Sequence, residues 1–137
     1  PGIIRKDNLY DVNRDLGNKK VVIFGGGLGI PNLSTDMTTV SKACEYNADV
    51  ILMAKNVDAI YDRNPKEEGA KKISEISHDD LLKTSLKQGS SSLMILDIEA
   101  LAKLAKFKIP MYVYNPNKID NMNDIILGEK GTKVITR

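Results

Sequence analysis

The residues of this chain that could do chemistry gather in one glycine-rich stretch, VVIFGGGLGIPNLSTD, at positions 21–36. Three consecutive glycines and Gly29 precede Ser34, Thr35 and Asp36, which open a stretch with helical apolar spacing. The backbone N–H groups of such a turn, together with the dipole at the start of a helix, bind anions, most often a phosphate. The stretch therefore predicts a turn that handles a nucleotide. The competing interpretation is a tight strand-to-helix turn without a ligand.

Two common nucleotide-binding motifs do not fit this turn. A Walker loop requires Lys and then Ser or Thr after its last glycine, where this chain has Ile30 and Pro31. The third conserved position of a dinucleotide-binding fingerprint must be a small residue. Counted from Gly25 this position is Ile30, and counted from Gly27 it is Asn32, and neither is small. Acid–base and nucleophilic catalysis have little support, because His78 is the one histidine and no carboxylate pair or metal-ligand spacing is recognisable. Phosphate positioning remains, with Lys55 as the stronger candidate cation and Lys42 as the weaker.

Length and composition are those of one ordinary globular domain. The chain has 137 residues and a formal net charge of +2, with charges of both signs interspersed, so neither nucleic acid nor a membrane surface is expected as a partner. Cys44 is the single cysteine, which excludes an internal disulfide and fits a reducing cytosol; its helical spacing favours core packing. No apolar run approaches the roughly 18 residues of a membrane-spanning helix. The chain begins with Pro1 rather than Met, which hints at an incomplete start.

The elements that must position the glycine turn are a strand before it and a helix after it. The apolar run 21–24 predicts a short buried strand. Ser34 or Thr35 can cap a helix that runs to about Tyr46, followed by Asn47 in the left-handed conformation. A short helix is expected before residue 17, on the spacing of its apolar residues.

The remaining pattern alternates strands and helices. Strands are expected at 50–53, 57–61 and 111–114, helices from Ser77 to Gly89 and over 94–106, and a hairpin from 124–127 and 133–136. The second of these helices should face the core with Ile95, Ile98, Leu101, Ala102 and Ala105. His78, in the first turn of a helix, is expected to be exposed, and 89–92 to be a flexible Ser-rich break. Such alternation predicts a three-layer αβα fold with a mostly parallel sheet, which binds ligands beyond the carboxyl ends of its strands.

The order of motifs carries a family resemblance. The glycine stretch is followed by ADVILMAKNVDAIYDRNP (48–65), LD-IEA (96–100), IPMYVYN (109–115) and LGEKGTKVIT (127–136). In this order and spacing the chain resembles the carboxyl-terminal half of bacterial uridylate (UMP) kinase, of the amino-acid-kinase superfamily. The resemblance implies that residues 1–137 are the nucleotide-binding part of such a domain, with the carboxyl-terminal part of that fold. It also implies ATP-dependent phosphorylation of UMP to UDP with Mg²⁺, in pyrimidine nucleotide biosynthesis, by a cytoplasmic homo-oligomer that is usually a hexamer.

The same resemblance assigns roles to individual residues. Asp36 matches an acidic residue close to the reacting phosphates, although a carboxylate in a first helical turn also suits the helix dipole. For ATP the matching residues are Lys55 or Asn56, then Tyr61 and Asn64. The UMP-binding turn and helix start correspond to Leu28, Gly29, Ile30, Pro31, Asn32, Leu33, Ser34 and Thr35.

Departures from the family pattern lower the expected activity. Leu28 and Ile30 stand where the family has hydrogen-bonding side chains, Ala59 where it has glycine, and Asn64 where it has an acidic residue. The lysine-containing phosphate loop of the family's amino-terminal half has no match in these residues. We therefore expect this chain alone not to turn over UMP, and to bind ATP weakly and UMP more weakly. The alternative is a non-catalytic, nucleotide-sensing or oligomerising module derived from such a kinase; a superfamily kinase acting on a carboxylate or carbamate fits the motifs less well.

Overall fold

A computed structural model describes residues 8–88 and 95–136, so the expected break at 89–92 lies outside the described residues. The chain divides into two compact units, Pro1–Leu33 and Ser34–Arg137. The expectation that residues 1–137 form one domain stays a prediction.

The first unit contains the predicted short helix and the glycine turn. Helix α1, Leu9–Gly17, is capped at its N-terminus by Asn8, whose side chain accepts a hydrogen bond from the Asp11 N–H group at 2.8 Å. The turn has φ of +84° at Gly26 and +72° at Gly29. A Cβ atom added at either glycine would meet nothing within 4 Å, so the backbone conformation rather than crowding requires glycine there.

The predicted strand at residues 21–24 is wrong. No ladder is assigned to this run, and Val21 and Ile23 are 90% and 88% exposed. A strand needs a neighbouring strand to pair with and a face to bury. Among the described residues no strand is assigned beside this run, so four apolar residues in a row do not by themselves make a strand.

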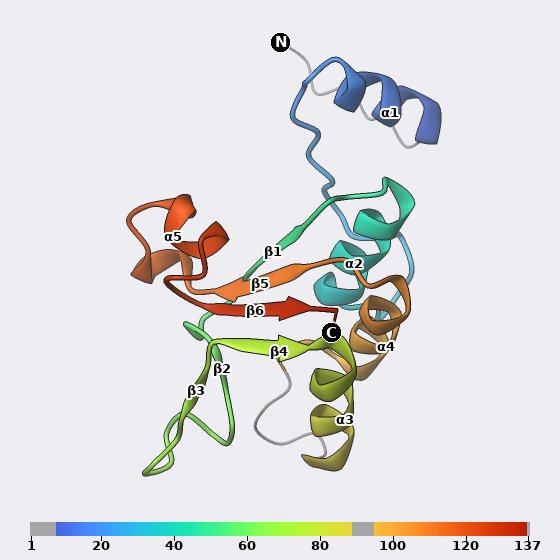
Figure 1. Ribbon diagram of the computed structural model, residues 1–137. Coiled ribbons are helices and arrows are strands. Elements are labelled where there is room, and N and C mark those ends of the chain that lie inside the picture. The colour runs from blue at the N-terminus through green and yellow to red at the C-terminus, as the bar shows by residue number, and fades with distance from the viewer. Residues whose placement is uncertain (1–7, 89–94, 137) are drawn as a thin grey trace. The chain divides into compact units, whose positions relative to one another are not determined.

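The second unit is built on a four-stranded sheet, which Figure 1 shows with its strands labelled. Its strands are β1 (Ile51–Ala54), β5 (Met111–Tyr114), β6 (Thr132–Ile135) and β4 (Glu75–Ser77), in the order β1-β5-β6-β4. The pairs β1·β5 and β4·β6 are parallel, and β5·β6 is antiparallel. The expectation of a mostly parallel α/β sheet is confirmed.

Helices lie on both faces of this sheet (Figure 1). Helices α2 (Thr35–Glu45), α3 (His78–Gln88) and α4 (Ile98–Phe107) enclose the main core, and Cys44 packs against that core as expected. Burial raises the pKa of the Cys44 thiol, and nearby Lys103 opposes this. On the other face, Ile125 of α5 (Met122–Ile126) packs with Tyr112 and Tyr114.

A two-stranded antiparallel hairpin, β2 (Ile60–Tyr61) with β3 (Lys72–Ile73), adjoins the sheet. Thr132 joins it to β6, because its hydroxyl accepts from the Ile60 N–H group at 2.8 Å and donates to the Ile73 carbonyl. A 3₁₀ turn, Pro116–Lys118, follows β5.

Three further expectations are corrected. Residues 124–127 do not form a strand: they fall in and after α5, which Asn121 caps and which buries Ile125 while Leu127 stays 72% exposed. His78 is buried, at 2% exposure, because its Nε2 atom makes a 2.8 Å hydrogen bond with the Ile109 carbonyl. Helix α4 begins at Ile98 rather than at 94, and Asp97 is its N-cap. Ala102, which was expected to face the core, is exposed, and Leu104 is buried in the core instead. Position 94 itself lies outside the described residues.

Candidate functional site

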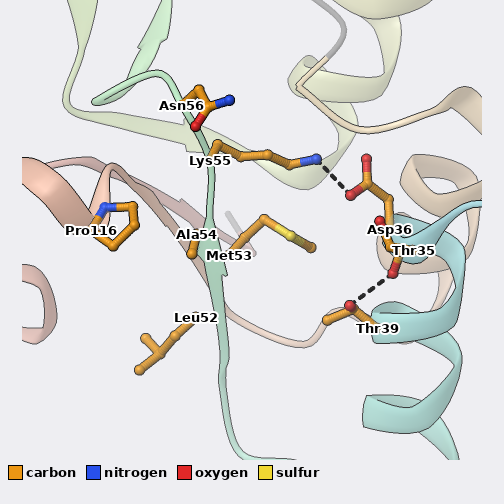
Figure 2. A pocket seen from close by; sticks show the side chains of 9 residues that line it. All are labelled: Thr35, Asp36, Thr39, Leu52, Met53, Ala54, Lys55, Asn56 and Pro116. Atoms are coloured by element: carbon orange, nitrogen blue, oxygen red, sulfur yellow. Dashed lines mark hydrogen bonds and ion pairs between the residues drawn. The ribbon is translucent and has the colours of Figure 1, made fainter. Parts of the chain in front are cut away.

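A cleft of about 530 Å³ opens at the carboxyl end of β1, beside the first turn of α2 (Figure 2). This is the edge of the sheet where parallel α/β folds bind ligands. The residues that line the cleft are Thr35, Asp36, Thr39, Leu52, Met53, Ala54, Lys55, Asn56 and Pro116.

An ion pair lies in this cleft. Lys55 Nζ is 2.5 Å from Asp36 Oδ1, and the two side chains are 24% and 15% exposed (Figure 2). Partial burial weakens solvent screening, so this pair is stronger than an ion pair on an open surface. The sequence placed these two residues on different elements, and the structure brings them into contact.

The end of β5 holds Lys55 in place. The backbone N–H group of Lys55 donates to the Tyr114 carbonyl at 2.8 Å, which extends the β1·β5 ladder by one hydrogen bond. Asn115 then donates its side-chain amide to the Asn56 carbonyl at 2.9 Å and accepts from the Asn117 N–H group at 2.9 Å. Sequence reasoning missed Asn115; an Asn directly after a buried strand was the available signal.

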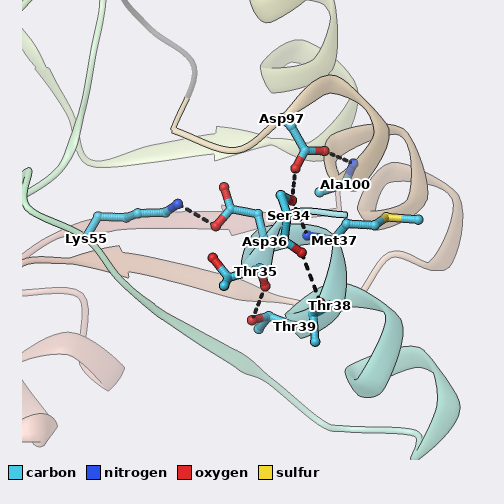
Figure 3. Close-up of polar contacts among 9 residues, drawn as sticks. All are labelled: Ser34, Thr35, Asp36, Met37, Thr38, Thr39, Lys55, Asp97 and Ala100. Atoms are coloured by element: carbon cyan, nitrogen blue, oxygen red, sulfur yellow. Dashed lines mark hydrogen bonds and ion pairs between the residues drawn. The ribbon is translucent and has the colours of Figure 1, made fainter. Parts of the chain in front are cut away.

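Hydrogen bonds at the start of α2 hold Asp36 in place (Figure 3). Ser34 is the N-cap, and its hydroxyl accepts from the Met37 N–H group at 3.0 Å. The Thr39 hydroxyl donates to the Thr35 carbonyl at 2.8 Å. The Ser34 hydroxyl also donates to the carboxylate of Asp97, which is itself the N-cap of α4. Asp97 lies in the LD-IEA motif, but sequence reasoning gave it no role.

The residues that line the cleft include one acidic side chain, Asp36, and one basic side chain, Lys55. Lys55 is the one cation in the described lining, and Asp36 already compensates its charge. No group of three or more metal-ligating side chains occurs in the part of the chain that the structure describes. Mg²⁺, however, commonly binds nucleotide sites through one or two carboxylates together with the phosphates of its ligand. A single carboxylate at Asp36 therefore fits a Mg²⁺ ion that arrives with a nucleotide.

The structure separates the predicted nucleotide-binding residues into groups. Thr35, Asp36, Lys55 and Asn56 line the cleft, and Ser34 supports it as the cap of α2. Positions 28–33 belong to the other unit.

Tyr61 and Asn64 do not line the cleft. The Tyr61 hydroxyl donates to Asp58 at 3.1 Å, and Asn64 accepts from the Lys66 N–H group at 3.0 Å, which stabilises the turn after β2. A smaller hollow of about 240 Å³ borders this side, between β3 and the end of β5, and Asp58 and Lys72 line it.

Asp58 connects the hairpin residues electrostatically. Its carboxylate is 3.0 Å from Lys72 Nζ and accepts the Tyr61 hydrogen bond. Burial acts to raise the pKa of Asp58, but the hydrogen bonds from Lys72 and Tyr61 outweigh it and lower the pKa below its ordinary value. Burial and the Asp58 carboxylate raise the pKa of Tyr61. At neutral pH Asp58 is therefore charged and Tyr61 neutral.

Comparison with known families decides what kind of protein carries this site. The profile of the amino acid kinase family matches residues 1–115. The chain belongs to the amino acid kinase family. Its fold is similar to the crystal structure of UMP kinase from Bacillus anthracis, with a TM-score of 0.82 and 31% identity, covering 95% of this chain and 52% of that one.

Two further solved structures resemble this chain. UMP kinase from Ureaplasma parvum has a TM-score of 0.77 and 26% identity, covering 97% of this chain and 52% of that one. Uridylate kinase from Archaeoglobus fulgidus has a TM-score of 0.68 and 25% identity, covering 93% of this chain and 57% of that one. This chain thus spans about half the length of the solved kinases that it matches. Among its described helices none is long and apolar enough to cross a membrane.

Proposed function

We propose that this chain is the nucleotide-binding part of an ATP-dependent UMP kinase, which transfers the terminal phosphoryl group of ATP to UMP and yields UDP. One observation carries the proposal: Asp36, directly after the glycine turn, pairs with Lys55 in the cleft at the carboxyl end of β1. The similarity to UMP kinases of two bacteria supports the choice of substrate.

In this proposal Lys55 and Asp36 separate when the nucleotide binds. The Lys55 ammonium group turns to a phosphate oxygen of ATP, since a phosphate offers it more negative charge than one carboxylate does. Asp36 would hold the Mg²⁺ that accompanies ATP, and Thr35 and Asn56 line the same cleft, where they can hydrogen bond to phosphate oxygens. A Mg²⁺ ion held there would neutralise the charge that develops on the transferred phosphoryl group.

The remaining assignments follow the sequence. We assign the nucleoside end of ATP to the side of Tyr61 and Asn64, beyond Asn56, and UMP to positions 28–35. Backbone N–H groups of the glycine turn bind UMP in this assignment, because Leu28 and Ile30 offer no side-chain hydrogen bond. On the resemblance alone we further propose a cytoplasmic homo-oligomer that serves pyrimidine nucleotide biosynthesis.

The charge balance of the cleft favours a second candidate for the isolated chain. Phosphoryl transfer needs a surplus of positive charge around the transferred group, and the described lining is neutral, with Lys55 against Asp36. A module that binds nucleotide without turning it over fits this balance. We therefore propose that the 137-residue chain alone binds MgATP weakly, binds UMP more weakly and lacks kinase activity.

Calorimetry and a coupled assay of ADP release test both parts on the purified chain. MgATP, UMP and, as a control, inorganic phosphate are titrated separately. Measurable MgATP binding with little or no turnover is the expected result. Turnover close to that of a complete UMP kinase contradicts the inactivity of the chain, and failure of MgATP to bind at millimolar concentration contradicts the proposed site.

A further inference from the structure

The starts of α2 and α4 share one chain of hydrogen bonds (Figure 3). The Asp97 Oδ1 atom accepts from the Ala100 N–H group at 2.7 Å, which is the N-cap bond of α4. Its other oxygen, Oδ2, accepts from the Ser34 hydroxyl, and that hydroxyl accepts from the Met37 N–H group as the N-cap bond of α2. Two helix caps that are 63 residues apart in the sequence are thus directly joined.

Capping of α4 does not require this arrangement. An N-cap needs one acceptor oxygen, and Ser, Thr or Asn in that position caps a helix about as well as Asp. Asp97 uses its first oxygen for the cap and its second for Ser34. The second oxygen is therefore available for a task beyond the stability of α4.

The second oxygen of Asp97 binds at the exposed start of α2, through the Ser34 hydroxyl. Further along, Val40 is fully buried in the core with Leu101 and Leu104 of α4, and Lys103 donates to the Ser41 hydroxyl at 2.9 Å. Ser34 and Thr35 are exposed, so burial does not fix them. The bond to Asp97 acts at this exposed end, two residues before Asp36.

We propose that Asp97 is a positioning residue for the acceptor nucleotide, which acts through Ser34 to hold the start of α2, where the predicted UMP-binding stretch ends. This inference rests on the proposed function. It predicts a specific asymmetry: loss of the Ser34–Asp97 bond weakens UMP binding and leaves MgATP binding unchanged, because Lys55 and Asn56 are held by β5 instead.

A matched pair of Asp97 variants separates the effect of the Ser34–Asp97 hydrogen bond from the effects of the Asp97 charge and of the α4 cap. Asp97→Asn keeps the cap and can donate its amide to the Ser34 hydroxyl, but it removes the charge. Asp97→Ser also removes the charge and keeps a good cap, but its single short hydroxyl cannot serve both Ala100 and Ser34. Lys103→Met is the structural control, because it breaks a separate polar bond between α2 and α4, from Lys103 to Ser41.

Two measurements on the full 137-residue chain test the proposal: calorimetric affinity for UMP and for MgATP, and amide hydrogen exchange at Met37 in the absence of nucleotide. Relative to Asp97→Asn, we expect Asp97→Ser to bind UMP at least tenfold more weakly, to bind MgATP equally well, and to exchange the Met37 amide at least tenfold faster. Lys103→Met should resemble the unmodified chain in all three.

Each contrary result has a distinct meaning. Unchanged Met37 exchange in Asp97→Ser overturns the inference whether or not UMP binds. Faster exchange with equal UMP affinity in the two Asp97 variants also overturns it, because the coupling then does not reach the acceptor site. An unmodified chain that binds MgATP but no UMP contradicts the proposed substrate, and the claim that Asp97 positions UMP falls with it.

Discussion

Lys55 and Asp36 form a 2.5 Å ion pair although they come from different kinds of element. Asp36 lies in the first turn of α2, where the helix dipole stabilises a negative charge, and Lys55 follows the last residue of β1. A phosphate that binds the Lys55 ammonium group in place of Asp36 leaves the Asp36 carboxylate without this cation. The affinity of the cleft for phosphates therefore depends on both charges together.

Removal of Lys55 should weaken MgATP binding more than the loss of one hydrogen bond alone. A hydrogen bond to a charged group contributes about 1.5–3 kcal/mol, so we expect Lys55→Met to raise the Kd of MgATP by at least about tenfold, measured by calorimetry. Without Lys55, the Asp36 carboxylate repels the phosphates of ATP when no Mg²⁺ is present. In EDTA, the double variant Lys55→Met with Asp36→Asn should therefore bind ATP more tightly than Lys55→Met alone.

Two controls accompany this test. Lys83→Met, at an exposed position of α3, should leave the affinity unchanged. Strictly additive effects of the Lys55 and Asp36 substitutions would show that the ion pair has no part in binding.

The stability of the fold should depend on pH through Asp58. Its pKa is lowered from 3.8 in the folded chain, so its charged form stabilises the fold above that pH and this contribution is lost as the pH falls through the folded-state pKa. We expect Asp58→Asn to reduce the free energy of unfolding by about 1 kcal/mol at pH 7. The difference from the unmodified chain should shrink toward zero in urea titrations below pH 3.8.

The same interaction can be approached from its cation. Lys72→Met should cause a similar loss at pH 7, and the double variant should lose less than the sum of the two single variants. A difference between Asp58→Asn and the unmodified chain that persists unchanged at pH 3 would contradict the role given to the Asp58 carboxylate.

Gly131 should tolerate no side chain, because an added Cβ atom would lie 2.5 Å from the Val113 carbonyl and φ is +84°. We expect Gly131→Ala to lower the free energy of unfolding by about 2–5 kcal/mol, from backbone strain and collision together. Gly128→Ala is the matched control, since φ is +77° there and nothing lies within 4 Å. Its expected loss is about 1 kcal/mol. Equal losses in the two variants would rule out the collision.

His78 should contribute to stability through its buried hydrogen bond. His78→Leu leaves the Ile109 carbonyl without this partner, which costs about 1–3 kcal/mol when the group stays buried. Lys83→Leu, on the exposed side of the same helix, should change the free energy of unfolding by less than about 0.5 kcal/mol. Similar urea midpoints for both variants would mean that the His78 bond contributes nothing.

Local signals in the sequence predicted local structure well. The Ser34 cap and the left-handed Asn47 were both readable, because each depends on contacts within four residues. Strands β1 and β5 were readable as short apolar runs that end in polar residues. These signals were sufficient to predict the α/β class.

Predictions that needed knowledge of a distant partner failed. The run 21–24 resembles a buried strand, but pairing depends on a neighbouring backbone. His78 was expected at the surface, and the carbonyl that allows its burial is 31 residues away. Residues 124–127 were expected to form a strand, and a helical turn instead buries Ile125 alone against Tyr112 and Tyr114.

The sequence by itself determined that Asp36 opens a helix after a glycine turn and that Lys55 follows a strand, since caps, glycines and apolar runs are local properties. Only the tertiary structure decided that these two residues touch, that Asp97 reaches Ser34, and that Tyr61 and Asn64 lie apart from the cleft. The physical reason is that side-chain proximity follows from how α2 packs against β1 and α4. That packing arises from core contacts between residues far apart in the chain, such as Val40 and Leu101, which no short sequence pattern encodes.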